Sequence, residues 1–294
     1  LLHSDTIEEI YLQTTRGDHK SDDSPLNADN DNLGITIDEE LLVSLKGMTP
    51  ELKQRYIRSI HKELKDLCRV GTWQLEPLPD GRKTIGSKLV HKTKYRADGS
   101  FDKDKSRLVA LGFLERAGID FHATYSPMAS LTAVRLVLSL AVHNSLPIYH
   151  ADVPQAFLRA DLDTEVYLTL PKGINIYDET DTSRSTWNGF VLRLLRSLYG
   201  LKQAPQLWNK TLHVFFEKCG FTRADAEACL YYKLNKTSGL WCIVLCEVDD
   251  LVVTGTDKQA VNAFHHQLVT HFAQKDDAGN ADASSIAWEP ISSF

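Results

Sequence analysis

The stretch Cys246-Glu-Val-Asp-Asp-Leu-Val-Val253 places two adjacent aspartates, Asp249 and Asp250, between two apolar runs that each have the character of a β-strand. A tight turn between strands needs at most one Asp, and two neighbouring carboxylates repel each other without contributing to packing. A divalent cation would relieve the repulsion, since Mg²⁺ prefers hard carboxylate oxygens. Taken alone, the pair fits a plain surface turn as well as it fits a metal site.

A third carboxylate ends a separate apolar strand. In Ile148-Tyr-His-Ala-Asp-Val-Pro-Gln-Ala-Phe157, Asp152 closes a run that is otherwise expected to be buried, where a carboxylate is costly unless it is paired or bound to metal. A strand-end Asp and a hairpin Asp pair are what in-line phosphoryl displacement requires, because two metals about 4 Å apart bridge the attacking and leaving oxygens. We therefore interpret Asp152, Asp249 and Asp250 as candidate catalytic and metal-binding residues.

The patterns around these carboxylates mix helices with antiparallel hairpins and predict an α+β fold. Thr49 and Pro50 suit the first positions of a helix that runs to about Cys68. Further helices are predicted at 133–143, 205–218 and 257–274, and strands at 85–95, 107–113, 147–153, 166–170, 190–195, 229–234, 241–248 and 251–254. We expect an acidic disordered linker over 1–41, a folded region over 42–274 and an irregular tail over 275–294.

The net charge of −6 is unevenly distributed. Residues 1–41 hold eleven acidic and two basic residues, whereas the remainder holds 28 acidic and 31 basic residues. Nine Lys or Arg and four Asp fall between Asp80 and Leu108, where Asp98-Gly99 predicts a hairpin turn. Alternation along the first strand of this ribbon puts Lys88, Lys92 and Lys94 on one face. Such a face is either a phosphate contact or a solvated charged surface.

Bulk properties exclude several classes of protein. A chain of 294 residues with 43% hydrophobic residues can bury a sizeable core, and no apolar run approaches the roughly 20 residues that span a bilayer. The first residues do not form a signal peptide, so we expect a protein that is not secreted. The start at Leu1 leads us to expect a part of a longer chain. Five Cys without a CxxC pair indicate buried thiols rather than a zinc site.

A series of short motifs resembles, in its order along the chain, the reverse transcriptase of copia-type LTR retrotransposons. The resemblance runs from about Gly71 to about Gly255. The matching segments are Gly71-Thr-Trp-Gln-Leu75, Asp80-Gly-Arg-Lys-Thr-Ile-Gly86, Lys105-Ser-Arg-Leu-Val-Ala110 with Gly112-Phe113, Gly118-Ile-Asp120, Tyr125-Ser-Pro127, Val134-Arg135, Asp152 to Leu158, Ser197-Leu-Tyr-Gly-Leu-Lys-Gln-Ala-Pro205 with Trp208, and Val248-Asp249-Asp250. The block from Ser197 and the block from Asp152 are the most specific.

The resemblance implies a polymerase with fingers at about 70–145, which carry the basic ribbon, and a palm at about 146–274, an antiparallel sheet with helices on one face. It implies that Asp152 and Asp249 are the main ligands of two Mg²⁺ ions, with Mn²⁺ as a possible substitute, and that Asp250 completes the triad. The residues implied to bind the incoming nucleotide are Lys88 and Arg107 at the triphosphate, Phe157 as a bulky gate against a 2′-OH, and Gln203. Phe157 fits core packing equally well.

The implied activity is RNA-directed DNA synthesis: two-metal transfer of a nucleotide to a primer 3′-OH. The implied partners are an RNA or DNA template with its primer, dNTPs, and RNase H and integrase regions of a polyprotein that this chain does not contain. The implied location is intracellular, in a cytoplasmic virus-like particle or the nucleus, with no membrane attachment.

Several positions depart from the family pattern: Glu247 stands at a usual Tyr, Leu89 at a usual Trp, Ala160 at a usual Gly, and Leu114-Glu115-Arg116 at a usual Gln-containing run. We also find no primer-grip or thumb segment. These departures keep two other hypotheses open. One is a catalytically silent relic or repurposed nucleic-acid-binding module from a decayed element, and the other is a two-metal phosphohydrolase or nuclease.

Overall fold

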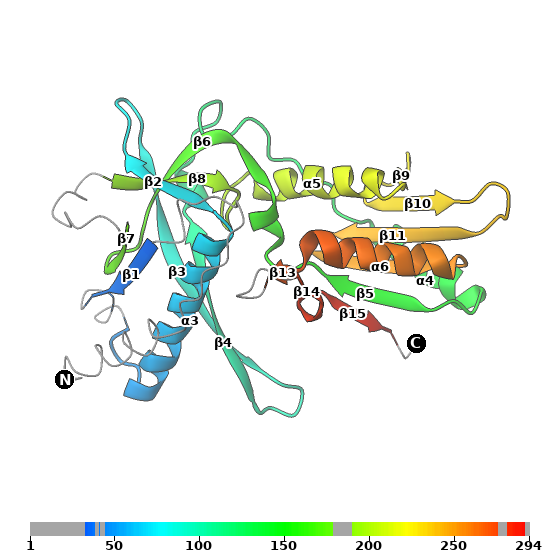
Figure 1. The fold of residues 1–294 in the computed structure, drawn as a ribbon, viewed down its shortest axis with the longest axis horizontal. Coiled ribbons are helices and arrows are strands. Elements are labelled where there is room, and N and C mark those ends of the chain that lie inside the picture. Colours follow the sequence, from blue (N-terminus) through cyan, green and yellow to red (C-terminus); the bar gives the residue numbers. More distant parts are fainter. Residues whose placement is uncertain (1–32, 39–40, 42–44, 179–189, 276–280, 292–294) are drawn as a thin grey trace. The chain divides into compact units, whose positions relative to one another are not determined.

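The computed structural model describes residues 33–38, 41, 45–178, 190–275 and 281–291. The chain forms two compact units, one comprising residues 1–109 and 167–193 and the other residues 110–166 and 194–294 (Figure 1). No helix in the described residues combines the length and apolar character needed to cross a membrane.

A five-stranded sheet in the order β2-β8-β6-β3-β4 makes up the core of the first unit, while residues 161–166 of β6 and 194–196 of β8 belong to the second unit. The strands are β2 (Trp73–Pro77), β3 (Thr84–Tyr95), β4 (Phe101–Ala110), β6 (Asp161–Thr169) and β8 (Phe190–Arg196). A separate antiparallel pair joins β1 (Leu33–Ile37) to β7 (Ile174–Asp178). The unit also contains one long helix, α3 (Pro50–Arg69).

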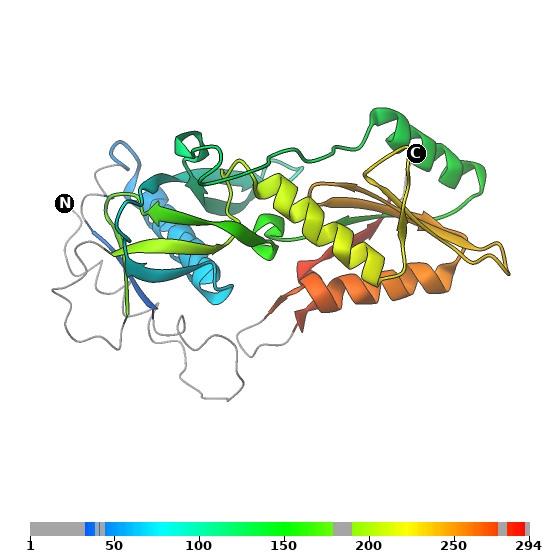
Figure 2. The ribbon, with the colours of Figure 1, turned by 90° about the horizontal axis from the view of Figure 1, so that it is seen from above.

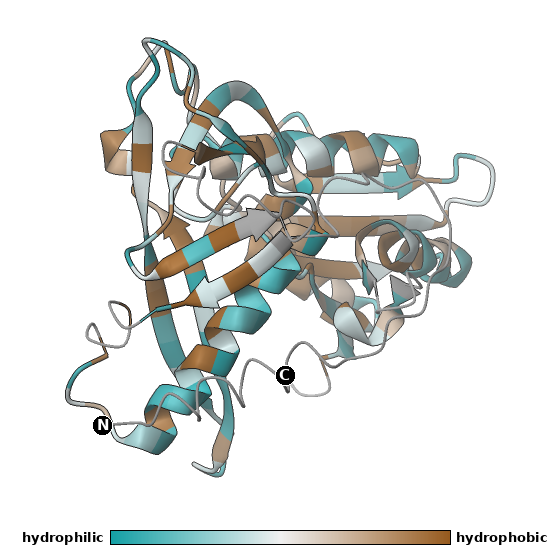
Figure 3. Cartoon of the chain, turned by 60° about the vertical axis from the view of Figure 1, so that its left-hand side comes forward, coloured by the Kyte–Doolittle hydropathy of each residue, from teal (hydrophilic) through white to brown (hydrophobic). Residues whose placement is uncertain are grey.

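Helix α3 begins where the sequence predicts it. The Thr49 hydroxyl accepts a hydrogen bond from the Leu52 amide, and Pro50 occupies the first turn, where its missing N–H leaves no bond unmade. Ile60, Leu64 and Leu67 are fully buried along one stripe. Hydrophilic and hydrophobic residues alternate along this helix in Figure 3, as the predicted amphipathic pattern requires.

The basic ribbon is the hairpin of β3 and β4, and α3 packs against one of its faces. Arg55 Nε lies 2.7 Å from Asp104 Oδ2 in an ion pair, and the rings of Tyr56 and His91 stack with their centroids 4.7 Å apart. On β3 the residues that alternate with His91 are exposed. They are Lys88, Val90, Lys92 and Lys94. The predicted hairpin and its lysine face are confirmed. The opposite face of the hairpin packs against α3.

One carboxylate, Glu63, is buried under this ribbon. Its side chain on α3 accepts a hydrogen bond from the Leu108 amide at 3.3 Å. Burial raises the pKa of Glu63 to about 7, and the Leu108 hydrogen bond and the charge of Lys105 only partly oppose this. A carboxyl whose pKa is higher in the folded than in the unfolded chain stabilises the fold at low pH. That contribution is complete below the unfolded value and is lost as the pH rises through 7.

We predict that Glu63→Gln removes this pH dependence, because an amide of similar shape does not ionise. At pH 5 the variant and the parent chain should unfold with similar free energies, while at pH 8 the variant should be more stable by at most about 3 kcal/mol. Urea titrations at both pH values measure the difference. A stability difference that is the same at both pH values would show that Glu63 does not titrate in this range.

The second unit contains a six-stranded sheet in the order β15-β5-β12-β11-β10-β9. The strands are β5 (Ile148–Asp152), β9 (Thr222–Arg223), β10 (Leu230–Leu234), β11 (Trp241–Glu247), β12 (Asp250–Gly255) and β15 (Ala287–Pro290). The helices are α4 (Leu131–His143), α5 (Ala204–Lys218) and α6 (Lys258–Phe272). Short elements complete the unit: η1 (Gly112–Leu114), η2 (Ala156–Arg159), β13 (Gln274–Lys275), β14 (Ala281–Asp282) and η3 (Ala283–Ser285).

Both faces of the sheet in the second unit carry a helix. Figures 1 and 2 show α6 on one face and α4 on the other, and both helices contact β11 and β12. The expected arrangement, with the helices all on one face, therefore does not hold for α4. The apolar pattern of α4 predicted a helix correctly, with Ser130 as its N-cap, but a helix pattern does not say which face of a sheet it covers.

The ends of the chain differ from expectation in the residues that are described. Of the predicted linker, residues 1–32 and 39–40 lie outside the described part, while Leu33–Ile37 forms β1. In the segment expected to be an irregular tail, β15 pairs with β5 at the edge of the sheet. Trp288 secures it by stacking on Tyr149 at 5.1 Å and on His265 at 4.2 Å. A strand of four residues is too short to give a periodic signal.

Candidate functional site

The central hairpin of the second unit carries the aspartate pair. Strands β11 and β12 are joined by a two-residue turn, Val248-Asp249, and Glu247 lies opposite Asp250. On the other side of β12, Asp250 lies directly opposite Asp152 of β5. Residues directly opposite on antiparallel strands have Cβ atoms about 4.5–5.5 Å apart. The structure thus brings together two of the three predicted carboxylates by register and places the third, Asp249, in the adjoining turn.

Glu247, Asp250 and Asp152 point to the same face of the sheet, because opposite residues on paired strands share a face. All three side chains are exposed to solvent at the ends of their strands. The opposite face of the same strands is apolar, and Leu251, Val253 and Ala151 are fully buried there. Three carboxylates in one exposed row form a strongly negative edge.

His150 lies on the same face as Asp152, two residues before it. Its Nε2 donates a hydrogen bond to Asp250 Oδ1 at 2.8 Å, and the Asp250 side chain remains 59% exposed. This contact follows from the register, since His150 and Asp250 are diagonal neighbours across β5 and β12. His150 is not among the residues predicted for the site. Its spacing from Asp152 in a strand is the signal that would have placed the two side chains on one face.

Within the described residues, no group of three or more His, Cys, Asp or Glu side chains is arranged to hold a metal ion. The three predicted ligands are therefore neighbours but not a preformed cage. One oxygen of Asp250 is engaged by His150, and Asp249 lies in the turn rather than in the row.

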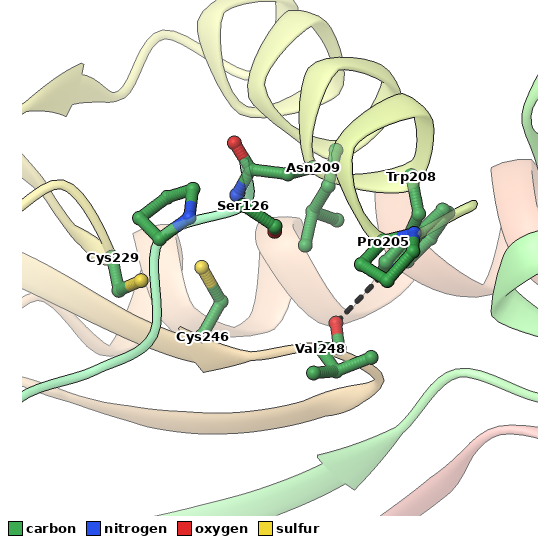
Figure 4. A pocket seen from close by; sticks show the side chains of 9 residues that line it. Ser126, Pro205, Trp208, Asn209, Cys229, Cys246 and Val248 are labelled. Atoms are coloured by element: carbon green, nitrogen blue, oxygen red, sulfur yellow. Dashed lines mark hydrogen bonds between the residues drawn. The ribbon is translucent and has the colours of Figure 1, made fainter. Parts of the chain in front are cut away.

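The turn itself has a defined conformation. Val248 has φ +57°, a left-handed conformation that β-branched residues strongly disfavour. Both carbonyls of the turn accept hydrogen bonds from other elements. The Trp208 indole N–H donates to Val248 O at 2.6 Å (Figure 4), and the Val153 amide donates to Asp249 O at 2.9 Å. No local sequence pattern indicates this link between α5 and the turn.

Phe157 lies in η2, five residues after Asp152. It is half-buried, and its ring meets the ring of Tyr199 edge-on, with the two centroids 5.4 Å apart. Gln155, at the N-cap of η2, has φ +55°. Residues in left-handed backbone therefore stand beside both aspartate-bearing segments. Such strained positions often accompany functional sites.

Gln203 is buried, with 1% of its surface exposed, at the N-cap of α5. Its Nε2 donates a hydrogen bond to Asp120 O at 3.1 Å. Next to it, Glu115 Oε2 accepts from the Lys202 amide at 2.8 Å, and burial raises the pKa of Glu115. Gln203 thus joins a buried polar network, in which Arg116 binds the Asp120 carboxylate at 3.0 Å.

The second ribbon strand ends at Ala110 rather than at 113, where the chain meets the loop before α5. Gly112 lies so close to the Gly200 carbonyl that a Cβ would collide with it. The chain leaves the strand there and enters η1, and the Ala110 amide donates to Tyr199 O at 2.7 Å.

We predict that Gln203→Ala lowers the free energy of unfolding by about 1–3 kcal/mol, because it removes a buried hydrogen bond to the Asp120 carbonyl, which keeps the bond from the Thr164 hydroxyl at 2.8 Å. The matched control is Gln206→Ala on the same helix, where the side chain is half-buried; its effect should stay within about 0.5 kcal/mol. Chemical denaturation of both variants tests this. If both variants lost the same free energy of unfolding, the hydrogen bond of Gln203 would not contribute to stability.

Lys88 and Arg107, the other predicted nucleotide contacts, belong to the first unit. Lys88 is exposed on β3, and Arg107 is half-buried on β4. Both lie in the basic ribbon, as predicted.

Comparison with known proteins adds a family match. Residues 70–284 match the family described as "Reverse transcriptase (RNA-dependent DNA polymerase)". The chain is 32% identical over 224 residues to the Retrovirus-related Pol polyprotein from transposon TNT 1-94 of Nicotiana tabacum. The matched region makes up 76% of this chain and 16% of the tobacco protein. The chain is 35% identical over 223 residues to the Retrovirus-related Pol polyprotein from transposon RE2 of Arabidopsis thaliana, covering 76% and 15%.

A yeast relative, the Transposon Ty1-ER2 Gag-Pol polyprotein of Saccharomyces cerevisiae, is 29% identical over 214 residues. That match covers 71% of this chain and 11% of the yeast protein. Among solved structures, apo telomerase from Candida tropicalis matches with a TM-score of 0.37 and 9% identity, over 81% of this chain and 56% of that one. The chain thus spans 16% or less of the length of these curated relatives.

Proposed function

Because the chain belongs to the reverse transcriptase (RNA-dependent DNA polymerase) family, we propose that it is the RNA-directed DNA polymerase core of a copia-type retrotransposon polyprotein. The observation that carries the proposal is the register that sets Asp250 opposite Asp152, with Asp249 in the adjoining turn. On this proposal the second unit is the palm and the first unit supplies the fingers.

The carboxylates fit a divalent cation, Mg²⁺ or Mn²⁺. Asp152, Asp249 and Asp250 would hold it, since they offer hard oxygen donors on neighbouring backbone positions at a solvent-exposed edge. Mg²⁺ keeps several waters and is commonly bound by one or two carboxylates with substrate phosphates, so a closed cage of protein ligands is not required. When bound, the ion would activate the primer hydroxyl and neutralise charge on the leaving phosphates.

The chain's own residues have four further tasks. Arg107 offers a planar fork of donors that suits phosphate oxygens, and Lys88 adds an exposed positive charge. Phe157 supplies bulk against a 2′-OH and is held by its contact with Tyr199. For Gln203 we propose a positioning role, because its amide would have to leave Asp120 before it could reach a nucleotide. The substrates are dNTPs and a primed RNA or DNA template, and RNase H and integrase would be other regions of the polyprotein.

The test is primer extension on poly(rA)/oligo(dT) with Mg²⁺ or Mn²⁺. We predict incorporation by the parent chain and a loss of at least about 100-fold in Asp249→Asn or Asp152→Asn, because each removes a charge that holds the ion. Asp225→Asn is the matched control: it makes the same change at an exposed site and should retain activity.

One observation favours the alternative of a silent nucleic-acid-binding module. Glu247 lies opposite Asp250 and adds negative charge to the edge where a primer phosphate would lie. Binding of the primed template without incorporation would support this alternative. Cleavage of the template without dNTPs would instead support a two-metal nuclease.

We further predict that Lys88→Gln, Lys92→Gln and Lys94→Gln together weaken binding to primed template and reduce the slope of log affinity against log salt by about 2 to 3. The control is Arg58→Gln, Lys62→Gln and Lys65→Gln on α3, which removes the same charge from exposed sites outside the ribbon. Fluorescence anisotropy between 50 and 200 mM salt measures both. An equal loss in the two triple variants would show that net charge alone governs binding.

A further inference from the structure

Among the described residues outside glycine, only Ser145, Gln155 and Val248 have positive φ. Val248 is the β-branched one, and left-handed backbone is least tolerated by β-branched side chains. It is the first residue of the two-residue turn and directly precedes Asp249. The direction of the Asp249 carboxylate therefore depends on a backbone conformation that valine does not adopt unaided.

One side chain from another element supports that conformation. The Trp208 indole N–H donates to the Val248 carbonyl at 2.6 Å, and Figure 4 shows the ring of Trp208, on α5, directed at the turn. The donor is held firmly: Trp208 is 1% exposed, and its ring meets the edge of Phe272, on α6, at 5.3 Å. A buried donor with few rotamers loses little entropy in making this bond.

The second carbonyl of the turn provides an independent reporter. Asp249 O accepts from the Val153 amide at 2.9 Å, and Val153 directly follows Asp152. The turn is thus tied to α5 at one residue and to the Asp152 segment at the next. If the Trp208 hydrogen bond were lost and the turn relaxed, the hydrogen bond from the Val153 amide to Asp249 O would break as well.

We infer that Trp208 is a positioning residue that fixes the Asp249 carboxylate by holding Val248 in the left-handed conformation. This inference rests on the proposed function for its catalytic consequence, though not for its structural one. Trp208 itself touches neither metal nor substrate; it acts through the backbone of the turn.

The experiment is a double-mutant cycle in the full chain with Trp208→Phe, Val248→Gly and the two combined. Phenylalanine keeps an aromatic ring but removes the donor, and glycine adopts the left-handed conformation without help. Trp208→Phe should lower kcat of primer extension by about 10- to 100-fold with little change in KM for dNTP, because a displaced carboxylate affects the chemical step. In the Val248→Gly background, adding Trp208→Phe should change kcat by no more than about threefold, because glycine holds the left-handed conformation without the donor.

A control separates this role from general loss of stability. Phe216→Leu, on the same helix and fully buried against Tyr231 and Phe264, weakens the core without touching the turn. Assayed well below its melting temperature, it should keep kcat, and adding Val248→Gly should not improve it.

The readout that does not need polymerase activity is hydrogen exchange at the Val153 amide. Exchange should be about 5- to 30-fold faster in Trp208→Phe and return toward the parent rate in the double variant. If the parent chain fails to extend primers, the proposed function fails while this measurement still decides the role of Trp208. An unchanged Val153 exchange rate in Trp208→Phe, or a double variant as defective as Trp208→Phe, would overturn the inference.

Discussion

The pairing of Asp250 with Asp152 across β12 and β5 is the constraint on which the candidate site depends. Two carboxylates about 5 Å apart repel each other by about 1 kcal/mol in water and by about 3 kcal/mol at an effective dielectric constant of 20. The fold accepts this repulsion at an exposed strand end, where water screens it. The hydrogen bond from His150 and the neighbouring turn both follow from the same register.

The apolar side of the same strands holds that register in place. Leu251, Val253 and Ala151 are fully buried against a core that α5 and α6 cover with aromatic side chains. A slip by one residue would turn Leu251 and Ala151 to the exposed strand ends of the other face and the carboxylates into the core, which is far more costly than the repulsion between them. Packing on one face of the sheet thus positions charge on the other.

Residues in the most specific motifs contribute to the scaffold as much as to chemistry. Gln203 and Trp208 both come from the segment that opens α5, and both are buried. One anchors the loop that follows the basic ribbon through Asp120, and the other anchors the turn that bears Asp249. A motif of polar and aromatic residues can therefore mark the supports of a site rather than its contacts with substrate.

The sequence by itself determined the local elements, the cap at Thr49, the mixed α and β composition and the family, because periodicity, capping and motif order are properties of neighbouring residues. Only the tertiary structure decided that Asp250 rather than Asp249 faces Asp152, that His150 joins them, that Gln203 is buried, that α4 covers the second face, and that β15 adds an edge strand. Strand register and burial arise from contacts between residues far apart in the chain. No local pattern encodes those contacts, because the energy that selects them is shared over a whole packed face.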